Sequence, residues 1–233
     1  MTREQWIEEI LKTYLLVSVL SDRNDCKTLR IRHREFGKDL VLRTFPTRVT
    51  AYDELLPIRS PHLPEIFESL ALEDGHGTLE EYVDGITVAE MMETVRYSYK
   101  EARTVLLGLC NALTVLHEQR IIHRDIKPEN ILIDGNGRIV LIDLNISRIE
   151  NGNTRDTVVM GTVGYASPEQ LGIAQSDART DIYAAGVLLN VLLTGKHPSE
   201  TLASGRAGRI VRKCTDVNPS ARFQSARQLA EAL

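Results

Sequence analysis

The sequence predicts an α+β protein of two lobes, a smaller lobe of mainly antiparallel strands and a larger, mainly α-helical lobe. Period-two apolar runs dominate the first part of the 233-residue chain, whereas apolar residues at helical spacing dominate after Gly85. No internal repeat or low-complexity tract interrupts this order. Strands followed by helices are typical of α+β folds, and we expect the break near residue 84.

The composition is that of a soluble globular protein. Apolar residues make up 42% and charged residues 26% of the chain, which excludes disordered and collagen-like classes. A net charge of −4 gives no basic field for nucleic acid, and three cysteines are too few for a disulfide framework. The longest apolar runs are too short to span a membrane, and glutamates interrupt the N-terminal stretch. We therefore expect a cytoplasmic protein with no nucleic-acid partner and no membrane segment.

The smaller lobe is predicted to open with a helix over residues 2–13. Thr2 and Gln5 have the spacing of a capping box, and Trp6 belongs to an apolar face with helical period. Strands are expected from the alternation of apolar and polar residues, and a short helix from the apolar stretch before Pro57. The predicted strands cover 14–20, 27–35, 38–45, 63–72 and 76–83, and the short helix is expected within the stretch 51–58, where Pro57 and Pro61 stop it.

The larger lobe is predicted to contain helices around one hairpin. Two short strand signals flank Gly135-Asn136-Gly137, which is typical of a hairpin turn. Apolar residues recur at helical spacing on either side of this hairpin. The predicted helices cover 87–95, 99–119, 180–193, 207–217 and 223–233.

The chemistry of the chain is concentrated in His123-Arg124-Asp125-Ile126-Lys127-Pro128-Glu129-Asn130. Asp143 follows thirteen residues after Asn130, beyond the predicted hairpin, so it can return to the same place. A carboxylate, an ammonium and an amide in one short loop, with a second carboxylate nearby, can hold a divalent cation, offer a base and neutralise a phosphate.

This block resembles the catalytic loop of the eukaryotic-type protein kinase family, the bacterial Ser/Thr or Hanks-type kinases. Four further segments resemble the family's motifs in the same order: LIDLN, GTVGYASPEQ, TDIYAAGVLL and NPSARFQSA. The resemblance implies a bilobal protein-kinase-like fold in which residues 1–233 form one domain. Its N-lobe is expected over about 14–84, after the helix 2–13, and its C-lobe over about 85–233.

The resemblance also implies roles for single residues. Asp125 would accept a hydrogen bond from the attacking hydroxyl and act as the base, and Lys127 would meet the transferring phosphoryl oxygens. Asn130 and Asp143 would hold Mg²⁺, or Mn²⁺ in its place, beside ATP. Thr162 would hydrogen-bond near Asp125 and Lys127, as in Ser/Thr-directed members.

The sequence of the first lobe departs from the family's pattern at the positions that bind the nucleotide. Ser21, Arg23 and Cys26 stand at the three positions of the phosphate-covering loop that are glycine in the family. A side chain at each position is expected to hold the backbone off the phosphates or to disorder the turn. For contacts to the base, the resemblance implies Glu81 and Val83 in the connecting segment and Leu132 as the floor.

Arg43 replaces the strand lysine that meets the α- and β-phosphates in the family. The helix glutamate that pairs with this lysine would fall on Ala51. The sequence leaves open whether Arg43 pairs with Asp53, Glu54 or Glu80, or contacts only phosphate. Glu80 occupies the gatekeeper position before Glu81-Tyr82-Val83, where a buried carboxylate would need a partner.

The second lobe keeps the family's structural and regulatory positions. The resemblance pairs Glu169 with Arg222 and uses Asp181 to brace the catalytic loop. Arg124 stands at the position of an arginine that in the family often binds a phosphorylated residue of the activation segment. Thr154 and Thr157 are the candidate acceptors; alternatively they only shape the loop while Asp156 stands in for phosphate.

These features favour a protein serine/threonine kinase that transfers the γ-phosphate of ATP to protein hydroxyls. The alternative is a pseudokinase, a binding or regulatory module with little or no transfer, which the altered nucleotide grip would favour. A small-molecule kinase is a third reading, disfavoured by the GTVGYASPEQ segment. The sequence shows no sensor, membrane-anchor or peptide-binding module, so any such element is expected on another polypeptide, as a regulatory partner in trans, or outside the given sequence.

Overall fold

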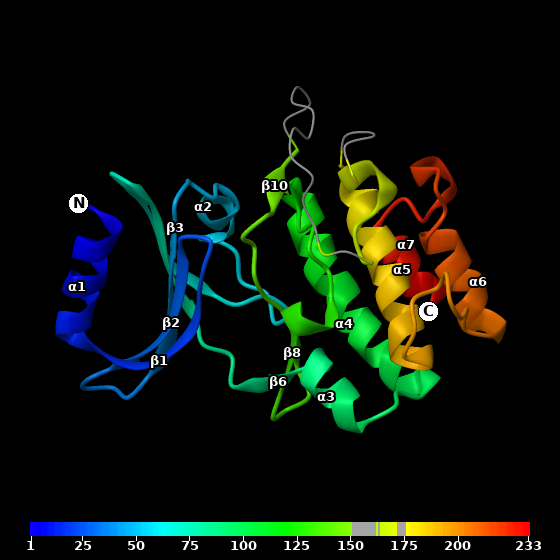
Figure 1. The fold of residues 1–233 in the computed structure, drawn as a ribbon, viewed down its shortest axis with the longest axis horizontal. Coiled ribbons are helices and arrows are strands. Elements are labelled where there is room, and N and C mark those ends of the chain that lie inside the picture. The colour runs from blue at the N-terminus through cyan, green and yellow to red at the C-terminus, as the bar shows by residue number, and fades with distance from the viewer. Residues whose placement is uncertain (151–161, 163, 172–175) are drawn as a thin grey trace. The chain divides into compact units, whose positions relative to one another are not determined.

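The computed structural model describes residues 1–150, 162, 164–171 and 176–233. The chain divides into two compact units, each of which is described by itself. Unit 1 comprises Met1–Ser60 with Pro64–Val83, and unit 2 comprises Pro61–Leu63 with Asp84–Leu233. Unit 1 holds a sheet with two helices and unit 2 holds mainly helices (Figure 1), which confirms the α+β fold class.

Unit 1 is an antiparallel sheet with strand order β1-β2-β3-β5-β4. The capping box predicted at its first helix is present, because Thr2 accepts from the Gln5 backbone and the Gln5 side chain accepts from the Thr2 backbone. The elements of unit 1 are α1 (Arg3–Thr13), β1 (Tyr14–Arg23), β2 (Cys26–His33), β3 (Asp39–Phe45), α2 (Ala51–Leu55), β4 (Ile66–Leu72) and β5 (Gly75–Glu81).

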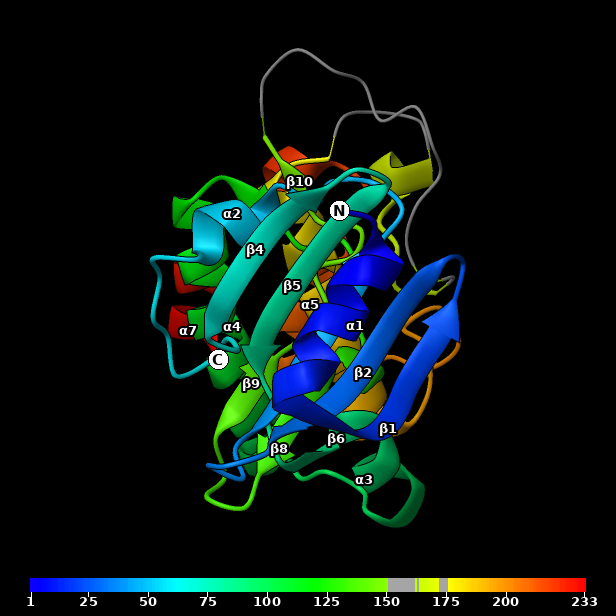
Figure 2. The ribbon, with the colours of Figure 1, turned by 90° about the vertical axis from the view of Figure 1, so that its left-hand side faces the viewer.

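Helix α1 covers one face of this sheet (Figure 2). Trp6 is buried against Leu29, Ile31 and Leu42, which alternate along β2 and β3 and therefore share a face. A Cβ atom at Gly77 would lie 2.6 Å from the Trp6 ring, so β5 needs glycine there for the helix to approach. Since side chains alternate along a strand, the residues between these apolar positions point to the opposite face of the sheet.

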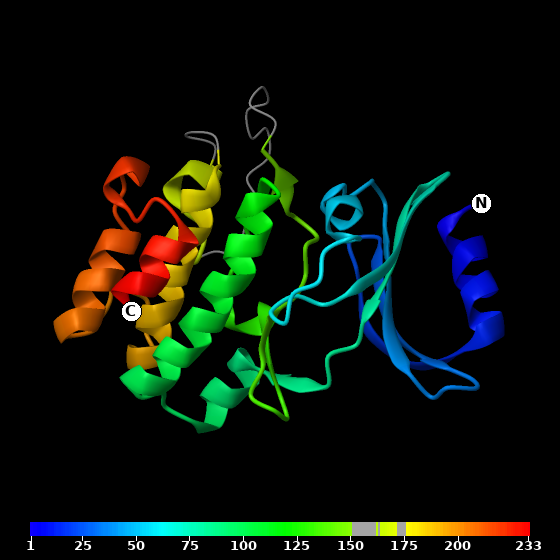
Figure 3. The ribbon, with the colours of Figure 1, turned by 180° about the vertical axis from the view of Figure 1, so that it is seen from behind.

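Unit 2 packs its helices side by side (Figure 3), with α4 against α5 and α7, and α5 against α6. None of the helices in the described ranges is long and apolar enough to cross a membrane. The helices of unit 2 are α3 (Val88–Thr94), α4 (Tyr99–Glu118), α5 (Ala178–Thr194), α6 (Gly205–Cys214) and α7 (Ala226–Ala232). Its strands are β6 (Gly85–Thr87), β7 (Ile121–Ile122), β8 (Ile131–Asp134), β9 (Ile139–Leu141) and β10 (Arg148–Ile149).

The predicted hairpin is formed by β8 and β9, which β6 extends to a three-stranded sheet. Helix α4 packs against this hairpin at Gly108, where a Cβ atom would lie 2.4 Å from Ile139 Cβ. Glycine at this position therefore allows β9 to pack directly on α4, because the Cβ atom of any larger residue would overlap Ile139. The hairpin thereby places the residues just before β8 and just after β9 at the same end.

Candidate active site

The segment 123–130 connects β7 to β8 and ends in a 3₁₀ turn over Pro128–Asn130. Arg124 has a φ of 70°, a left-handed conformation that is uncommon for residues with a Cβ atom. The side chains of Asp125, Lys127 and Asn130, which follow it, contact one another. The loop is thus shaped by its backbone before any ligand is considered.

Asp125 is the centre of this loop. Its Oδ1 accepts the hydroxyl of Thr162 at 2.6 Å, and its Oδ2 lies 2.6 Å from Lys127 Nζ and 2.9 Å from Asn130 Nδ2. Lys127 also donates to Thr162 Oγ1 at 2.9 Å, which closes a ring of contacts. Burial alone would raise the pKa of Asp125, but the bonds from Lys127, Thr162 and Asn130 outweigh it and lower the pKa below its ordinary value. The carboxylate is therefore ionised and held in one orientation.

Asp181, in the first turn of α5, fixes the start of the loop. Its Oδ1 accepts the backbone N–H of Arg124 at 2.8 Å and its Oδ2 accepts that of His123 at 2.9 Å. His117 Nε2 lies 2.8 Å from the same Oδ2. Burial raises the pKa of Asp181, but the contacts with His117 and the backbone bonds lower it below its ordinary value. A buried carboxylate with three partners is a rigid anchor for the backbone of Arg124.

Glu169 and Arg222 form a buried ion pair next to a residue that contacts the segment 123–130. Arg222 donates to both Glu169 oxygens, at 2.6 and 2.9 Å, and to three backbone carbonyls. Gln170 follows Glu169 and donates from Nε2 to the Arg124 carbonyl at 2.8 Å. The pair therefore fixes the backbone next to Gln170, which in turn holds the segment 123–130.

Asn130 and Asp143 flank the same end of the β8–β9 hairpin. The N–H of Ile142 donates to the Asn130 carbonyl at 2.9 Å, beyond the last ladder pair of Ile131 with Leu141. Asp143 has a φ of 71°, and its Oδ1 accepts the N–H of Asn145 at 3.2 Å. The hairpin ladder therefore holds the backbone of Asn130 next to the chain that leads into Asp143.

These two residues fit a hard divalent cation. The Asn130 amide nitrogen is engaged by Asp125, so its oxygen is the atom that suits a cation, and Asp143 adds a carboxylate. Across the ranges that the structure describes, no three His, Cys, Asp or Glu side chains gather into a metal-binding group. Two oxygen ligands match the way Mg²⁺ is held, by one or two protein groups together with substrate phosphates.

In unit 1, Arg43 is paired with Glu80. Arg43 Nε donates to Glu80 Oε1, and Nη1 donates to Thr28 Oγ1 at 3.3 Å. Asp53, a partner that the sequence left open, instead lies 2.8 Å from Arg48 Nη2 and accepts the Ser69 hydroxyl at 2.6 Å. The structure thus decides among the alternatives in favour of Glu80.

Glu54, the other helix carboxylate considered for Arg43, is exposed on α2. Helix α2 has five residues, and its N-cap Thr50 makes no side-chain capping bond. Neither acidic residue of this helix therefore takes the place of the family's helix glutamate.

The glycine-free turn between β1 and β2 is a tight two-residue hairpin. Arg23 pairs with Cys26, and Asn24 and Asp25 between them have φ values of 52° and 60°. Asn and Asp tolerate this left-handed conformation, which is typical of a type I′ turn. Of the two consequences expected from the missing glycines, disorder of the turn is wrong. Arg3 of α1 also donates to Asp25 O at 2.7 Å and ties the turn down.

The remaining predicted residues lie at ordered positions or outside the described ranges. Glu81 ends β5 and accepts the Glu65 N–H, and Val83 is buried at the end of unit 1. Leu132 lies in β8, paired with Thr87 and Val140. Thr154 and Thr157 fall outside the residues that the structure describes.

Two positioning residues were not singled out from the sequence. His117 lies four residues after Leu113, so helical spacing puts it on the buried face of α4. A polar residue on that face is a signal that it needs a buried partner, which is Asp181. Gln170 gave no such signal, because nothing local indicates that its amide reaches the Arg124 carbonyl.

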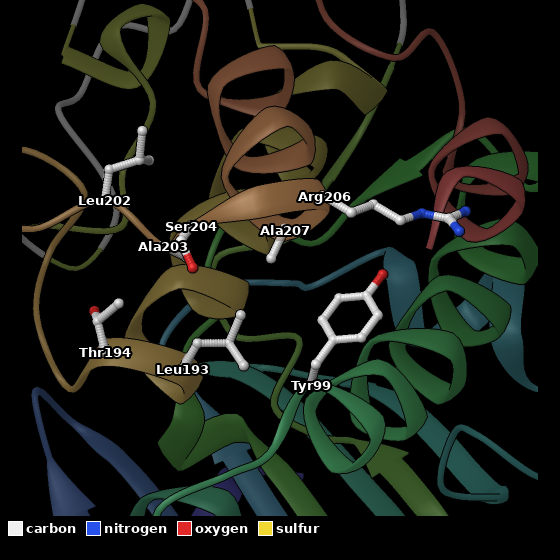
Figure 4. A pocket seen from close by; sticks show the side chains of 8 residues that line it. All are labelled: Tyr99, Leu193, Thr194, Leu202, Ala203, Ser204, Arg206 and Ala207. Carbon is white, nitrogen blue, oxygen red and sulfur yellow. The ribbon is translucent and has the colours of Figure 1, made fainter.

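A cavity of about 530 Å³ lies elsewhere in unit 2 (Figure 4). Its walls include Tyr99 at the start of α4, Leu193 near the end of α5, and Arg206 with Ala207 in the first turn of α6. No residue of the segment 123–130 is among them, so this cavity is separate from the Asp125 cluster.

Comparison with known families and proteins adds an independent observation. The model of the protein kinase domain matches residues 53–232. Serine/threonine-protein kinase PknB of Mycolicibacterium smegmatis is 35% identical over 150 residues, which are 60% of this chain and 24% of that protein. Serine/threonine-protein kinase D of Synechocystis sp. is 28% identical over 219 residues, 84% of this chain and 42% of that protein.

Serine/threonine-protein kinase PknB of Mycobacterium tuberculosis is 40% identical over 123 residues, 51% of this chain and 20% of that protein. The chain therefore spans less than half the length of each of these three curated relatives.

Proposed function

The chain belongs to the protein kinase family, and on that premise we propose that it is a protein serine/threonine kinase that transfers the γ-phosphate of ATP to Ser and Thr hydroxyls of proteins. The observation that carries the proposal is the ring of contacts between Asp125, Lys127 and Thr162. This ring combines an oriented acceptor with a cation that can meet phosphoryl oxygens. The names of the relatives support the same activity.

Asp125 would orient the attacking hydroxyl by accepting a hydrogen bond from it. The lowered pKa keeps this carboxylate ionised at neutral pH, so it can accept that bond without first losing a proton. Lys127 would move its ammonium toward the transferring phosphoryl group while Thr162 keeps the Asp125 carboxylate in place.

The family uses ATP with a divalent metal, and here we propose Mg²⁺, with Mn²⁺ as a substitute. Asn130 would hold the ion through its amide oxygen and Asp143 through its carboxylate. When bound, the ion neutralises charge on the phosphates. Arg43 would meet the phosphates from unit 1, and Glu81, Val83, Leu132 and Asp143 would complete the nucleotide contacts.

Regulation through the activation segment is part of the proposal. Arg124 would receive a phosphate on Thr154 or Thr157, and phosphorylation would order the segment through charge-assisted bonds. Mass spectrometry of the purified protein after incubation with ATP tests this. Phosphate on either threonine in an active sample is expected, and an active sample without it would remove autophosphorylation as the switch. A regulatory partner in trans is the alternative source of control.

The transfer activity is tested with Mg-ATP and a mixed Ser/Thr protein substrate. The variant Asp125→Asn removes the acceptor charge and is expected to lose transfer. Glu93→Gln removes an exposed carboxylate on α3 and should transfer at the wild-type rate. A wild type that binds Mg-ATP but transfers no phosphate would favour the pseudokinase instead.

A further inference from the structure

The face of the unit 1 sheet opposite α1 carries a row of buried polar side chains across three neighbouring strands. Arg43 on β3 lies directly opposite Thr28 on β2 and Thr78 on β5. Glu80 lies two residues beyond Thr78, opposite Val41. Side chains two residues apart on a strand share a face, so Arg43 and Glu80 are diagonal neighbours within reach of each other.

The pair is almost wholly shielded from water. Arg43 is 8% exposed and Glu80 is 3% exposed. Arg43 donates to the Glu80 carboxylate through Nε and to the Thr28 hydroxyl through Nη1. Buried charges are costly unless they are paired, and removal of one partner leaves the other uncompensated. The carboxylate of Glu80 therefore restricts the guanidinium of Arg43 to one region of this face.

The acidic side chains of helix α2 do not contribute to this arrangement. Its Asp53 is engaged by Arg48 and Ser69 and lies 3.8 Å from His76 Nε2, and its Glu54 is exposed. The strands that carry Arg43 and Glu80 are joined by a continuous ladder of backbone bonds from Leu40–Glu81 to Phe45–His76. A cation held through that ladder has its position set by the sheet.

We propose that Glu80 is a positioning residue for nucleotide binding, which holds Arg43 on the sheet so that its guanidinium meets the phosphates without a carboxylate from α2. The inference rests on the proposed function, in which Arg43 is the phosphate-binding cation. A guanidinium presents its N–H donors in a fixed planar fork, a geometry that matches phosphate oxygens. Fixing the fork reduces the rotamer entropy that is lost when phosphate binds.

The proposal makes Arg43 the residue through which Glu80 acts, and a double-mutant cycle tests that dependence. Calorimetric titration of Mg-ATP into the full chain compares the wild type with Glu80→Gln, Arg43→Met and the double variant. We expect Glu80→Gln to weaken binding about tenfold, as loss of a bond to a charged group does. In the Arg43→Met background the same change should weaken binding by less than about twofold.

Two further variants separate positioning from a structural role. Asp53→Asn removes the α2 carboxylate and should leave the affinity for Mg-ATP unchanged. Glu80→Asp keeps the charge and should recover part of the lost affinity. Urea unfolding of every variant identifies any that fail to fold, and the neutral double variant avoids an unpaired buried charge. In the transfer assay Glu80→Gln should raise the KM for ATP more than it lowers kcat.

The outcomes distinguish this inference from the proposed function. Weaker binding in Arg43→Met with wild-type binding in folded Glu80→Gln would overturn the positioning role and leave the kinase activity standing. A larger loss in Asp53→Asn than in Glu80→Gln would assign the role to α2 instead. Equal losses from Glu80→Gln in both backgrounds would mean that Glu80 acts independently of Arg43. A folded wild type that binds no Mg-ATP would overturn both proposals.

Discussion

Thr162 donates its hydroxyl hydrogen to Asp125 at 2.6 Å and accepts a hydrogen bond from Lys127 at 2.9 Å. One hydroxyl therefore bridges and orients the two charged groups that the proposed transfer needs. Asp125 and Lys127 are two residues apart in the chain, whereas Thr162 comes from a different segment of unit 2. The position of Thr162 is thereby coupled to the orientation of the carboxylate.

Removing the hydroxyl should slow transfer without loss of the fold. Thr162→Val keeps the shape of the side chain but leaves Asp125 and Lys127 without their common partner. A bond to a charged group is worth about 1.5–3 kcal/mol, so we expect kcat to fall about 10- to 100-fold. Steady-state transfer assays measure this. Thr162→Ser keeps the hydroxyl and should retain most activity; equal losses in both variants would contradict the role of the bond.

The Glu169–Arg222 pair should make a large contribution to stability. Arg222→Met leaves the buried Glu169 carboxylate uncompensated, which costs about 3–5 kcal/mol in the free energy of unfolding. Urea denaturation measures the change. The same substitution at Arg227, whose contact with Glu118 at 3.7 Å is exposed, should cost less than about 1 kcal/mol. Similar losses in unfolding free energy in the two variants would show that burial does not increase the contribution of the Glu169–Arg222 pair.

Unit 1 should lose stability in acid through Asp39. Hydrogen bonds from Arg32, followed by those from Arg30, lower the pKa of Asp39 to about 2 from its ordinary 3.8. A carboxyl group with a lowered folded-state pKa stabilises the fold above its unfolded-state pKa. That contribution is lost as the pH falls from about 4 through about 2.

The test compares the pH dependence of unfolding in the wild type and Asp39→Asn. The difference in unfolding free energy should be constant above about pH 5 and should shrink as the pH falls toward 2. A difference that stays constant over this range would contradict the ion pairs of Asp39 with Arg30 and Arg32.

Local pattern was enough to predict most elements of the fold. The Thr2 and Gln5 spacing located the start of α1, and alternation located the strands of unit 1, because both signals are contained in a few neighbouring residues. The motif from His123 to Asn130 gave the candidate site for the same reason.

Long-range pairings could not be predicted in this way. The Arg43 partner depends on the register between β3 and β5, and Glu80 lies 37 residues away in the chain. His117 reaches Asp181 over 64 residues. The β1–β2 turn was misjudged in part because the absence of glycine was weighed without the tolerance of Asn24 and Asp25 for positive φ.

The central claim is that the site binds Mg-ATP through the carboxylate of Asp143 despite the altered residues of unit 1. Calorimetric titration of ATP into the wild type and Asp143→Asn, with and without Mg²⁺, tests it most directly. We predict binding by the wild type that requires Mg²⁺ and is lost in a folded Asp143→Asn variant. No binding by the wild type at millimolar nucleotide, or undiminished binding by the variant, would contradict the account.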